Sequence, residues 1–341
     1  MHMARILTGT VAAVVAIGFT ASAFAANPRV AWNHSVWGKQ RAFTAGIEKL
    51  AEIVSAKTGG KFTIKVHYGG ALSKAKENLD GIKLGAFQSA MFCNFYHPGK
   101  NPAFMVFSLP FLPLTNWRQS VAVRDSVYQH PALVADMDNW NAMTYLSTYL
   151  PQYEFMGKGK PPLQLADWKG LRVRAGGGIG DAMEKLGAVK TTMPATEVYT
   201  AIQRGTADAV SFPYTYAHAA YKIHEVAEWY TGNLSPGTSD CPIVFSKTAF
   251  DKLPANYKKI LDDAKDEVRA AQIDAYETID KKNLPMFKSR LQEIDYSDET
   301  LAEFRKVAGK PVWDEWVAKN KDKFDAQGVL DAVFKAAEAA K

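Results

Sequence analysis

The sequence predicts an α/β protein with two lobes, and three observations support this fold class. The chain has 341 residues, which is long enough for two lobes rather than one small core. Its first part alternates strand and helix patterns in the order β-α-β-α-β, which is typical of a mostly parallel sheet with helices on its faces. A second unit of strand, glycine-rich turn and helix begins near residue 170.

The elements of the first lobe follow from apolar spacing. Residues 30–34 form a predicted strand that runs into a loop, and residues 43–54 carry apolar positions every three or four residues, as on one face of a helix. Apolar residues then alternate over 62–68, which indicates a strand with one buried face. We expect a helix over 73–85, with Ser73 as its N-cap, and a strand over 86–92. A helix over 116–129 and a strand over 143–149 follow.

A loop at 157–162 that is rich in Gly, Pro and Lys leads into the second lobe. A strand over 170–174, four glycines and a helix over 182–186 would form an anion cradle, because the positive end of the helix points at the turn. A helix from Thr196, its expected N-cap, to Arg204 precedes a strand over 209–212. The strand over 241–246 returns to the first lobe, and the helical pattern over 254–293 is interrupted once, at Pro285.

The first 25 residues have the pattern of an export signal. Arg5 supplies a positive start, residues 11–19 are apolar or small, and residues 23–25 form a small-x-small cleavage site. A retained membrane anchor is the alternative, but the apolar stretch is shorter than the ~20 residues that span a bilayer. We therefore expect the mature chain to begin near Ala26 and to be periplasmic.

Composition narrows the class of function. The net charge is +6, from 41 basic and 35 acidic residues, and no basic run with interleaved aromatic residues indicates nucleic acid as a partner. The chain has no nucleophile elbow, zinc-protease or phosphate-loop motif, and the glycines after residue 175 lack the dinucleotide-binding spacing, so no cofactor is expected. The two cysteines, Cys93 and Cys241, are compatible with a disulfide or with two buried small side chains, and we favour the second.

Two motifs, taken in order, carry a family resemblance. The run Gly170-Leu171-Arg172-Val173-Arg174 is followed by a helix pattern over 193–203 and by the run 205–208 that ends in Asp208. This arrangement resembles the extracytoplasmic solute-binding proteins of tripartite ATP-independent periplasmic (TRAP) transporters. Residues 57–60 and 109–112 also look like hallmarks of that family.

The resemblance implies a two-lobe periplasmic binding protein fold with a hinge and a long helix that crosses both lobes. We expect lobe 1 over 26–150, with 239–275 returning to it, and lobe 2 over 151–238, with 276–341 packing on it. The implied function is that of a receptor, not an enzyme, which captures a small organic acid and delivers it to the small and large membrane subunits of a TRAP permease. A monomer is expected.

Candidate ligand-binding residues come from the resemblance and from the sheet. By the resemblance, Arg174 binds the carboxylate of the ligand, and an arginine fork matches a carboxylate in two parallel hydrogen bonds. Ligands of such sheets lie beyond the carboxyl ends of the strands, so the loops after residues 32 and 92 are also candidates. The full candidate set is Arg174, Phe212, Trp37, Asn33, His34, Asn94, Tyr96, Gln152, Tyr153, Tyr214, Tyr199 and Glu77.

One departure from the family pattern bears on the ligand. Phe212 stands where members of the family commonly carry an asparagine that hydrogen-bonds the ligand. A pocket lined by aromatic rings with one arginine suits a ligand with a carboxylate head and a flat or apolar body. The Trp-Glu pair with which some keto-acid binders hold a cation is missing, so no metal is expected.

Two other functions remain open from the sequence. A ligand-binding module of a sensor kinase would have the same fold. An exported enzyme that acts on a carboxylate would need an acid, base or nucleophile facing Arg174, and His34, His97, Glu77 and Asp208 form no recognisable arrangement.

Overall fold

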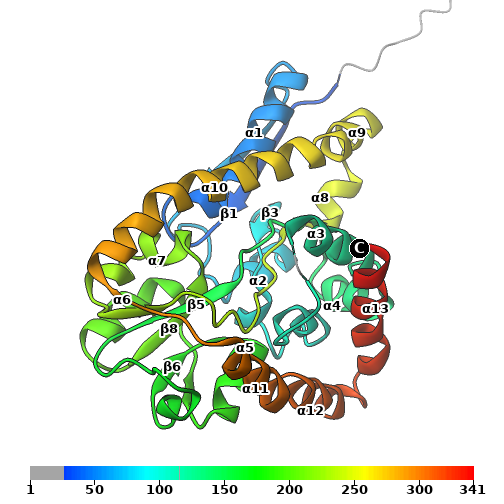
Figure 1. Ribbon diagram of the computed structural model, residues 1–341. Coiled ribbons are helices and arrows are strands. Elements are labelled where there is room, and N and C mark those ends of the chain that lie inside the picture. Colours follow the sequence, from blue (N-terminus) through cyan, green and yellow to red (C-terminus); the bar gives the residue numbers. More distant parts are fainter. Residues whose placement is uncertain (1–26, 115) are drawn as a thin grey trace, which may run out of the picture.

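Two sheets form the two lobes that the sequence predicts (Figure 1). The computed structural model describes residues 27–114 and 116–341, so the predicted signal peptide over 1–25 lies outside the described residues. The first sheet has the strand order β2-β1-β3-β10-β4, and the second has the order β11-β9-β5-β8-β6-β7. Helices cover both sheets, which confirms the predicted α/β class.

The first sheet contains β1 (Val30–Ser35), β2 (Phe62–His67), β3 (Ser89–Met91), β4 (Ala142–Leu146) and β10 (Ile243–Ser246). The second sheet contains β5 (Tyr153–Gly157), β6 (Arg172–Arg174), β7 (Val189–Thr191), β8 (Ala209–Pro213), β9 (Trp229–Thr231) and β11 (Gln292–Ile294).

The helices are α1 (Ala45–Lys57), α2 (Asn78–Lys83), α3 (Trp117–Val127), α4 (Pro131–Asp138), α5 (Gly177–Lys185), α6 (Val198–Gln203), α7 (Tyr216–Ala220), α8 (Lys247–Asp251), α9 (Ala255–Asp263), α10 (Lys265–Arg290), α11 (Asp298–Ala308), α12 (Lys310–Asn320) and α13 (Ala326–Ala339). Short segments of 3-10 helix are η1 (Ala42–Thr44), η2 (Asn94–Tyr96), η3 (Ala103–Ser108), η4 (Leu165–Trp168), η5 (Ala195–Glu197) and η6 (Ile223–Glu225). None of these helices combines the length and the apolar character that crossing a bilayer requires.

The first sheet is parallel at one edge and antiparallel at the other. β1 pairs in parallel with β2 and β3, as the β-α-β-α-β pattern predicts. The returning strand β10 inserts between β3 and β4 and is antiparallel to both. In β2 the alternation holds, because Phe62 and Ile64 are buried whereas Thr63 and Lys65 are exposed.

The second sheet contains strands that the sequence does not reveal. β5 lies between β8 and β9, antiparallel to both. All five residues of β5 are buried, including Glu154, so the alternation that marks a half-exposed strand is absent. β7, β9 and β11 have three residues each, which is too short for a periodic pattern.

The long helix α10 connects the two lobes, as predicted (Figure 1). Near its start, the Gln272 side chain donates to the carbonyl of Ala42 (2.5 Å) and accepts from the Gly46 amide (3.0 Å) in lobe 1. About two turns before its end, Asn283 donates to Thr215 of lobe 2 (3.0 Å). The predicted interruption at Pro285 is wrong, because Pro285 lies inside α10 and the chain leaves the helical path before it, between α9 and α10.

The C-terminal helices divide between the lobes. α11 and α12 contact α5 of the second lobe, whereas α13 packs against α3 of the first lobe. The Gln119 side chain of α3 donates to the Ala337 carbonyl of α13 (2.8 Å), and Val329 and Val333 join the apolar core beneath. The expectation that all of 276–341 packs on lobe 2 is therefore wrong for α13, because its apolar face matches the core of lobe 1.

The two cysteines form a disulfide, which corrects our preference for unpaired side chains. Register explains the pairing. Because β3 and β10 are antiparallel with Met91 opposite Ile243, the residues two positions beyond them, Cys93 and Cys241, also meet. The pairing of β3 with β10 joins segments about 150 residues apart, and nothing local in the sequence indicates it.

We predict that the double substitution Cys93→Ala/Cys241→Ala lowers the free energy of unfolding by about 2–5 kcal/mol. The bridge closes a loop with a sequence separation of 148, so its loss increases the freedom of the unfolded chain. Urea unfolding followed by circular dichroism measures the change. Reduced wild-type protein should match the variant, and an unchanged unfolding midpoint would contradict the prediction.

Candidate ligand-binding site

Arg174 is the last residue of β6 and is buried, with 1% of its surface exposed. Arg172, at the other end of the same short strand, is exposed and forms an ion pair with Asp208 (2.6 Å). This pairing gives Asp208 a structural role, since its carboxylate also accepts from the Arg172 main-chain amide (2.8 Å). The two arginines of one three-residue strand therefore have different environments, and only Arg174 lies between the lobes.

Main-chain carbonyls hold the guanidinium of Arg174. Its Nε and Nη2 donate to the Met193 carbonyl (3.2 and 3.0 Å), and Nη1 donates to the Ser211 carbonyl (3.1 Å). A guanidinium has five N–H groups. One N–H on Nη1 and one on Nη2 therefore remain, which is the pair that a carboxylate uses in a bidentate contact.

Aromatic rings flank the same guanidinium. Its central carbon lies 4.7 Å from the ring centre of Phe212 in lobe 2 and 5.4 Å from that of Phe95 in lobe 1. In the described part of the chain, the arginines that form ion pairs are Arg124, Arg172 and Arg269. Arg174 is thus a buried cation that rings and carbonyls stabilise, without a carboxylate partner among the described residues.

Beside Arg174 lies a narrow cavity of about 30 Å³ between the lobes. Arg174 does not itself line this cavity. It contacts the rings of Phe95 and Phe212, which do. Such a volume holds one or two water molecules but no aromatic ring. Its lining consists of Trp37, Arg41, Phe43, Cys93, Phe95, Tyr96, Leu150, Tyr153, Ala195, Phe212, Pro213, Tyr216, Ala217, Tyr221 and Cys241.

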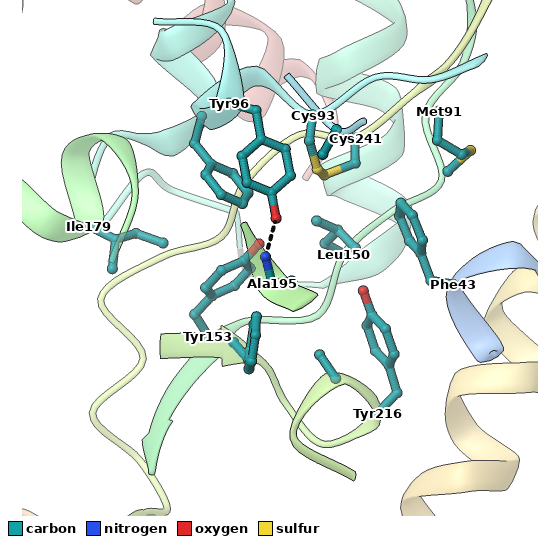
Figure 2. Close-up of a cluster of buried hydrophobic side chains, with 14 of the residues drawn as sticks. Phe43, Met91, Cys93, Tyr96, Leu150, Tyr153, Ile179, Ala195, Tyr216 and Cys241 are labelled. Carbon is teal, nitrogen blue, oxygen red and sulfur yellow. Dashed lines mark hydrogen bonds between the residues drawn. A yellow bond between two sulfur atoms is a disulfide. The ribbon is translucent and has the colours of Figure 1, made fainter. Parts of the chain in front are cut away.

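Figure 2 shows how this wall is assembled from both lobes. The hydroxyl of Tyr96, from lobe 1, accepts a hydrogen bond from the amide of Ala195 in lobe 2 (3.0 Å). The disulfide lies beside Leu150 and Tyr96.

Burial raises the pKa values of Tyr96 and Tyr153, whereas the charge of Arg174 acts in the opposite direction. Both phenols are therefore neutral hydrogen-bonding groups at physiological pH.

The structure brings together five of the candidate residues. Trp37, Tyr96, Tyr153 and Phe212 line the narrow cavity, and Arg174 contacts Phe212 from behind. Trp37 packs edge-on against Tyr96, with ring centres 5.5 Å apart. These five residues come from five separate stretches of the chain.

Asn33 and His34 do not reach the cavity, which corrects their assignment. The strand β1 continues to Ser35, so both residues lie in the sheet and not in the loop after it. His34 Nδ1 lies 2.7 Å from Ser89 Oγ, and Asn33 Oδ1 accepts from His67 Nε2 (2.8 Å). These contacts stabilise the first sheet.

Three other candidates have positioning contacts and do not line the cavity. The Asn94 side chain donates to the Phe104 carbonyl (2.9 Å) and accepts from the Phe95 amide (2.8 Å), which fixes the turn that presents Phe95. The main-chain carbonyl of Gln152 accepts from the Tyr214 amide (3.0 Å). The Tyr214 ring instead stacks on Tyr230, with ring centres 6.2 Å apart.

The remaining two candidates line wider cavities near the mouth of the cleft. Tyr199 borders a cavity of about 620 Å³ that also contains Arg41 and Tyr221 in its lining. Glu77 is exposed and borders another, of about 590 Å³, next to Trp37. Both lie outside the narrow cavity.

Sequence analysis missed several lining residues, notably Arg41, Phe95 and Tyr221. Phe95 lies between the candidates Asn94 and Tyr96 in a predicted loop, and this position is the signal that could have identified it as a lining residue. Arg41 precedes the first predicted helix and has no local signal of function. Its side chain turns back to the carbonyls of Trp37 (2.9 Å) and Lys39 (2.7 Å), which places it at the cavity.

The predicted anion cradle does not combine with Arg174. The helix α5 begins at Gly177, and the amide of Gly178 points at the hydroxyl of Ser108 from lobe 1 (3.4 Å). Gly177 and Gly178 line a separate cavity of about 290 Å³, together with Lys190 and other residues. Arg174 turns instead toward Met193 and Ser211, so the glycine-rich turn serves the contact between the lobes.

Within residues 27–114 and 116–341, no group of three or more His, Cys, Asp or Glu side chains is arranged to hold a metal ion. The groups that the site offers to a ligand are the guanidinium cations of arginines, the hydroxyls of tyrosines and the faces of aromatic rings.

Comparisons with known proteins agree with this geometry. Residues 33–320 match the family model described as "Bacterial extracellular solute-binding protein, family 7" (DctP). A monocarboxylate 2-oxoacid-binding periplasmic protein of Nostoc sp. is 26% identical over 95% of this chain and 93% of its own length.

Solved structures show the same fold. A TRAP periplasmic solute-binding protein from Desulfovibrio salexigens with bound orotic acid has a TM-score of 0.82, with 20% identity, and covers 91% of this chain and 99% of its own. A TRAP solute-binding protein from Rhodoferax ferrireducens in complex with copurified benzoate has a TM-score of 0.81, with 18% identity, and covers 91% of this chain and 98% of its own. At these identities the likeness concerns the fold alone.

The burial of His34 predicts how the free energy of unfolding depends on pH. Burial, aided by His67, lowers the pKa of His34 from 6.5 to about 3. Below pH 6.5 the unfolded chain therefore binds a proton that the folded chain does not, and stability falls as the pH drops toward 3, by about 1.4 kcal/mol per pH unit. We expect His34→Gln to remove this contribution between pH 6 and pH 4.5 in urea unfolding. Equal pH slopes for the two proteins would contradict it.

Proposed function

Because this chain belongs to the bacterial extracellular solute-binding proteins of family 7, the substrate-binding proteins of TRAP transporters, we propose that it is a periplasmic receptor for an aromatic or apolar-bodied carboxylate. Arg174 captures the carboxylate between the lobes. The receptor then delivers the acid unaltered to the membrane subunits of a TRAP permease.

The observation that carries this proposal is the state of Arg174. A buried guanidinium without a countercharge is costly unless its hydrogen bonds are satisfied. Three of its N–H groups donate to main-chain carbonyls, and the two that remain sit on neighbouring nitrogens. A ligand carboxylate supplies both the missing charge and the two missing acceptors.

The aromatic lining supports a ligand with a flat body. Phe95 and Phe212 flank the guanidinium, and Trp37, Tyr96 and Tyr153 complete the wall. Ring faces and edges stabilise an aromatic ligand through stacked and edge-on contacts. The benzoate and the orotic acid bound by two proteins of this fold are flat acids of this kind. The arginine contact contributes about 2–4 kcal/mol of the roughly 8 kcal/mol that micromolar binding requires, so ring packing supplies the rest.

Separation of the lobes would admit the ligand. Phe95 belongs to lobe 1 and Arg174 to lobe 2, so moving the lobes apart withdraws one of the two rings that cover the guanidinium. It also breaks the hydrogen bond between Tyr96 and Ala195. The ligand then favours reclosure, because only the closed form contacts it from both sides. The crossing helix α10 keeps the lobes in register during this movement.

Location and delivery follow from the export pattern over 1–25 and from the family. We propose that the mature monomer binds its ligand in the periplasm and that the closed form docks on the small and large permease subunits. No bond of the ligand changes in this cycle. A binding assay followed by mass spectrometry of the recovered ligand tests this point, since a converted product would indicate an enzyme.

We predict that Arg174→Met weakens benzoate binding at least about 30-fold, because truncating one partner of a buried charge pair costs about 2–5 kcal/mol. Isothermal titration calorimetry measures the affinity. Arg172→Met, on the same strand but exposed, is the matched control and should bind as wild type does.

Circular dichroism and the melting temperature show whether the Arg174 variant is folded. Arg174→Lys, which keeps the charge but loses the fork, should bind with an intermediate affinity. Wild-type affinity in a folded Arg174→Met protein would overturn the site.

We further predict that Phe212→Asn weakens binding of benzoate more than binding of a hydroxylated, non-aromatic acid such as gluconate. The substitution removes the ring against which a flat ligand packs and adds an amide that hydrogen-bonds a hydroxyl. Competition thermal-shift measurements with the two acids report the change in preference. The opposite order would argue against an aromatic pocket.

A further inference from the structure

A second arginine faces the narrow cavity and has no assigned role. Arg41 lies just before η1, in lobe 1, and lines both the narrow cavity and the cavity of about 620 Å³ outside it. Its guanidinium lies over the rings of Phe43 (4.8 Å) and Tyr221 (5.6 Å). Arg41 therefore sits where the inner and outer parts of the cleft adjoin.

Two stacked rings, Phe212 and Tyr221, lie between the guanidinium groups of Arg174 and Arg41. Arg174 lies 4.7 Å from the ring centre of Phe212, and Phe212 stacks on Tyr221 with centres 5.3 Å apart and planes 20° apart. Tyr221 then contacts Arg41. The two cations thus stand at opposite ends of one aromatic pair, and that pair forms part of the cavity wall.

The hydrogen bonds of Arg41 leave one edge of its guanidinium unused. Nη1 donates to the carbonyls of Trp37 and Lys39. Nε is buried and has no hydrogen-bond partner among the described residues. The edge formed by Nε and Nη2 is one of the two that bind a carboxylate in bidentate fashion.

A second polar atom without a partner lies at the same place. The Tyr221 hydroxyl is buried and makes no hydrogen bond within residues 27–114 and 116–341. A Cβ atom placed on Gly38 would lie 2.9 Å from this hydroxyl and 3.0 Å from Arg41 Nη1, so both groups pack against the same glycine from opposite lobes. Gly38 adopts φ +69°, and a larger residue there would press on both groups.

Charge favours an anion at this point. No carboxylate of the described chain lies within ion-pair distance of Arg41, and Glu48 instead accepts from Thr44 (2.6 Å) and Tyr68 (2.7 Å). Arg41 lines the aromatic cavity and Arg174 contacts two rings of its wall, and neither has a carboxylate partner among the described residues. A ligand with one carboxylate compensates one of them, whereas a ligand with two compensates both.

We propose that Arg41 and Tyr221 form a second anchor, which binds a second carboxylate of the ligand, and that the cargo is an aromatic dicarboxylate. This inference rests on the proposed function, because Arg174 holds the first carboxylate. The ring of the ligand lies along the aromatic pair of Phe212 and Tyr221. Because Arg41 comes from lobe 1 and Tyr221 from lobe 2, the second carboxylate also bridges the lobes.

The competing explanation is a latch, in which Arg41 merely contacts Tyr221 to hold the lobes together. A latch would stabilise the closed form with any ligand, so its loss would weaken all ligands equally. A second anchor affects only ligands that carry the second carboxylate.

The test compares benzoate with the three benzenedicarboxylates (1,2, 1,3 and 1,4) by isothermal titration calorimetry. We expect at least one dicarboxylate to bind wild-type protein about tenfold tighter than benzoate or better, as one charge-assisted contact provides. Arg41→Met should remove this advantage and leave benzoate affinity within about twofold, because the two anchors act on separate groups of the ligand. Arg41→Lys should restore part of it, and Arg118→Met, at an exposed arginine, is the control for charge removal.

Tyr221→Phe provides a second variant that preserves the ring stack, and it should weaken the dicarboxylate alone. Equal losses for benzoate and the dicarboxylate in Arg41→Met would establish the latch and overturn the anchor. If benzoate binds and no dicarboxylate binds tighter, the inference fails while the proposed function stands. If neither class binds, the proposed function fails and the inference fails with it.

Discussion

The site depends on one buried cation that the protein itself leaves uncompensated. Arg174 is 1% exposed and has main-chain carbonyls and two rings around it, but no carboxylate partner in the part of the chain that the structure describes. A protein selected for stability alone would pair this charge or replace it with an apolar side chain. The arrangement is reasonable only if the missing countercharge comes from outside, and this requirement explains why the guanidinium lies between two lobes and not within one.

The crossing segments make such a site possible. The Cys93–Cys241 bridge ties the end of β3 to the strand that returns from lobe 2, directly beside the cavity. Nearby, Asp240 accepts from buried Arg124 (2.9 Å) and from Tyr128 (2.7 Å), which fixes the same segment to lobe 1. Lobe 1 is therefore rigid up to the cavity wall. Contacts across the cleft, such as Tyr96 with Ala195, are few and reversible by comparison.

The same cavity wall contains the features from which we infer the class of acid. Phe212 replaces a polar arm of the pocket by a ring, and this ring connects Arg174 through Tyr221 to Arg41. Such a pocket has arginines at both ends and rings between them. A pocket for a hydroxylated acid needs instead polar side chains, such as amides and carboxylates, that form hydrogen bonds with the hydroxyls around the whole ligand. In the proposed function, specificity lies in this wall, and Arg174 provides the carboxylate contact.

The sequence by itself determined the α/β class and the family, because these depend on local periodicity and on two contiguous motifs. It also led to the proposals for Arg174 and for an aromatic pocket. It could not determine that β1 runs on to Ser35 and so removes Asn33 and His34 from the site, since strand ends depend on pairing with neighbours. Nor could it reveal β5, the Cys93–Cys241 bridge, the docking of α13 on lobe 1, or Arg41. Each of these results from contacts between residues far apart in the chain, whose register and direction only the folded structure specifies.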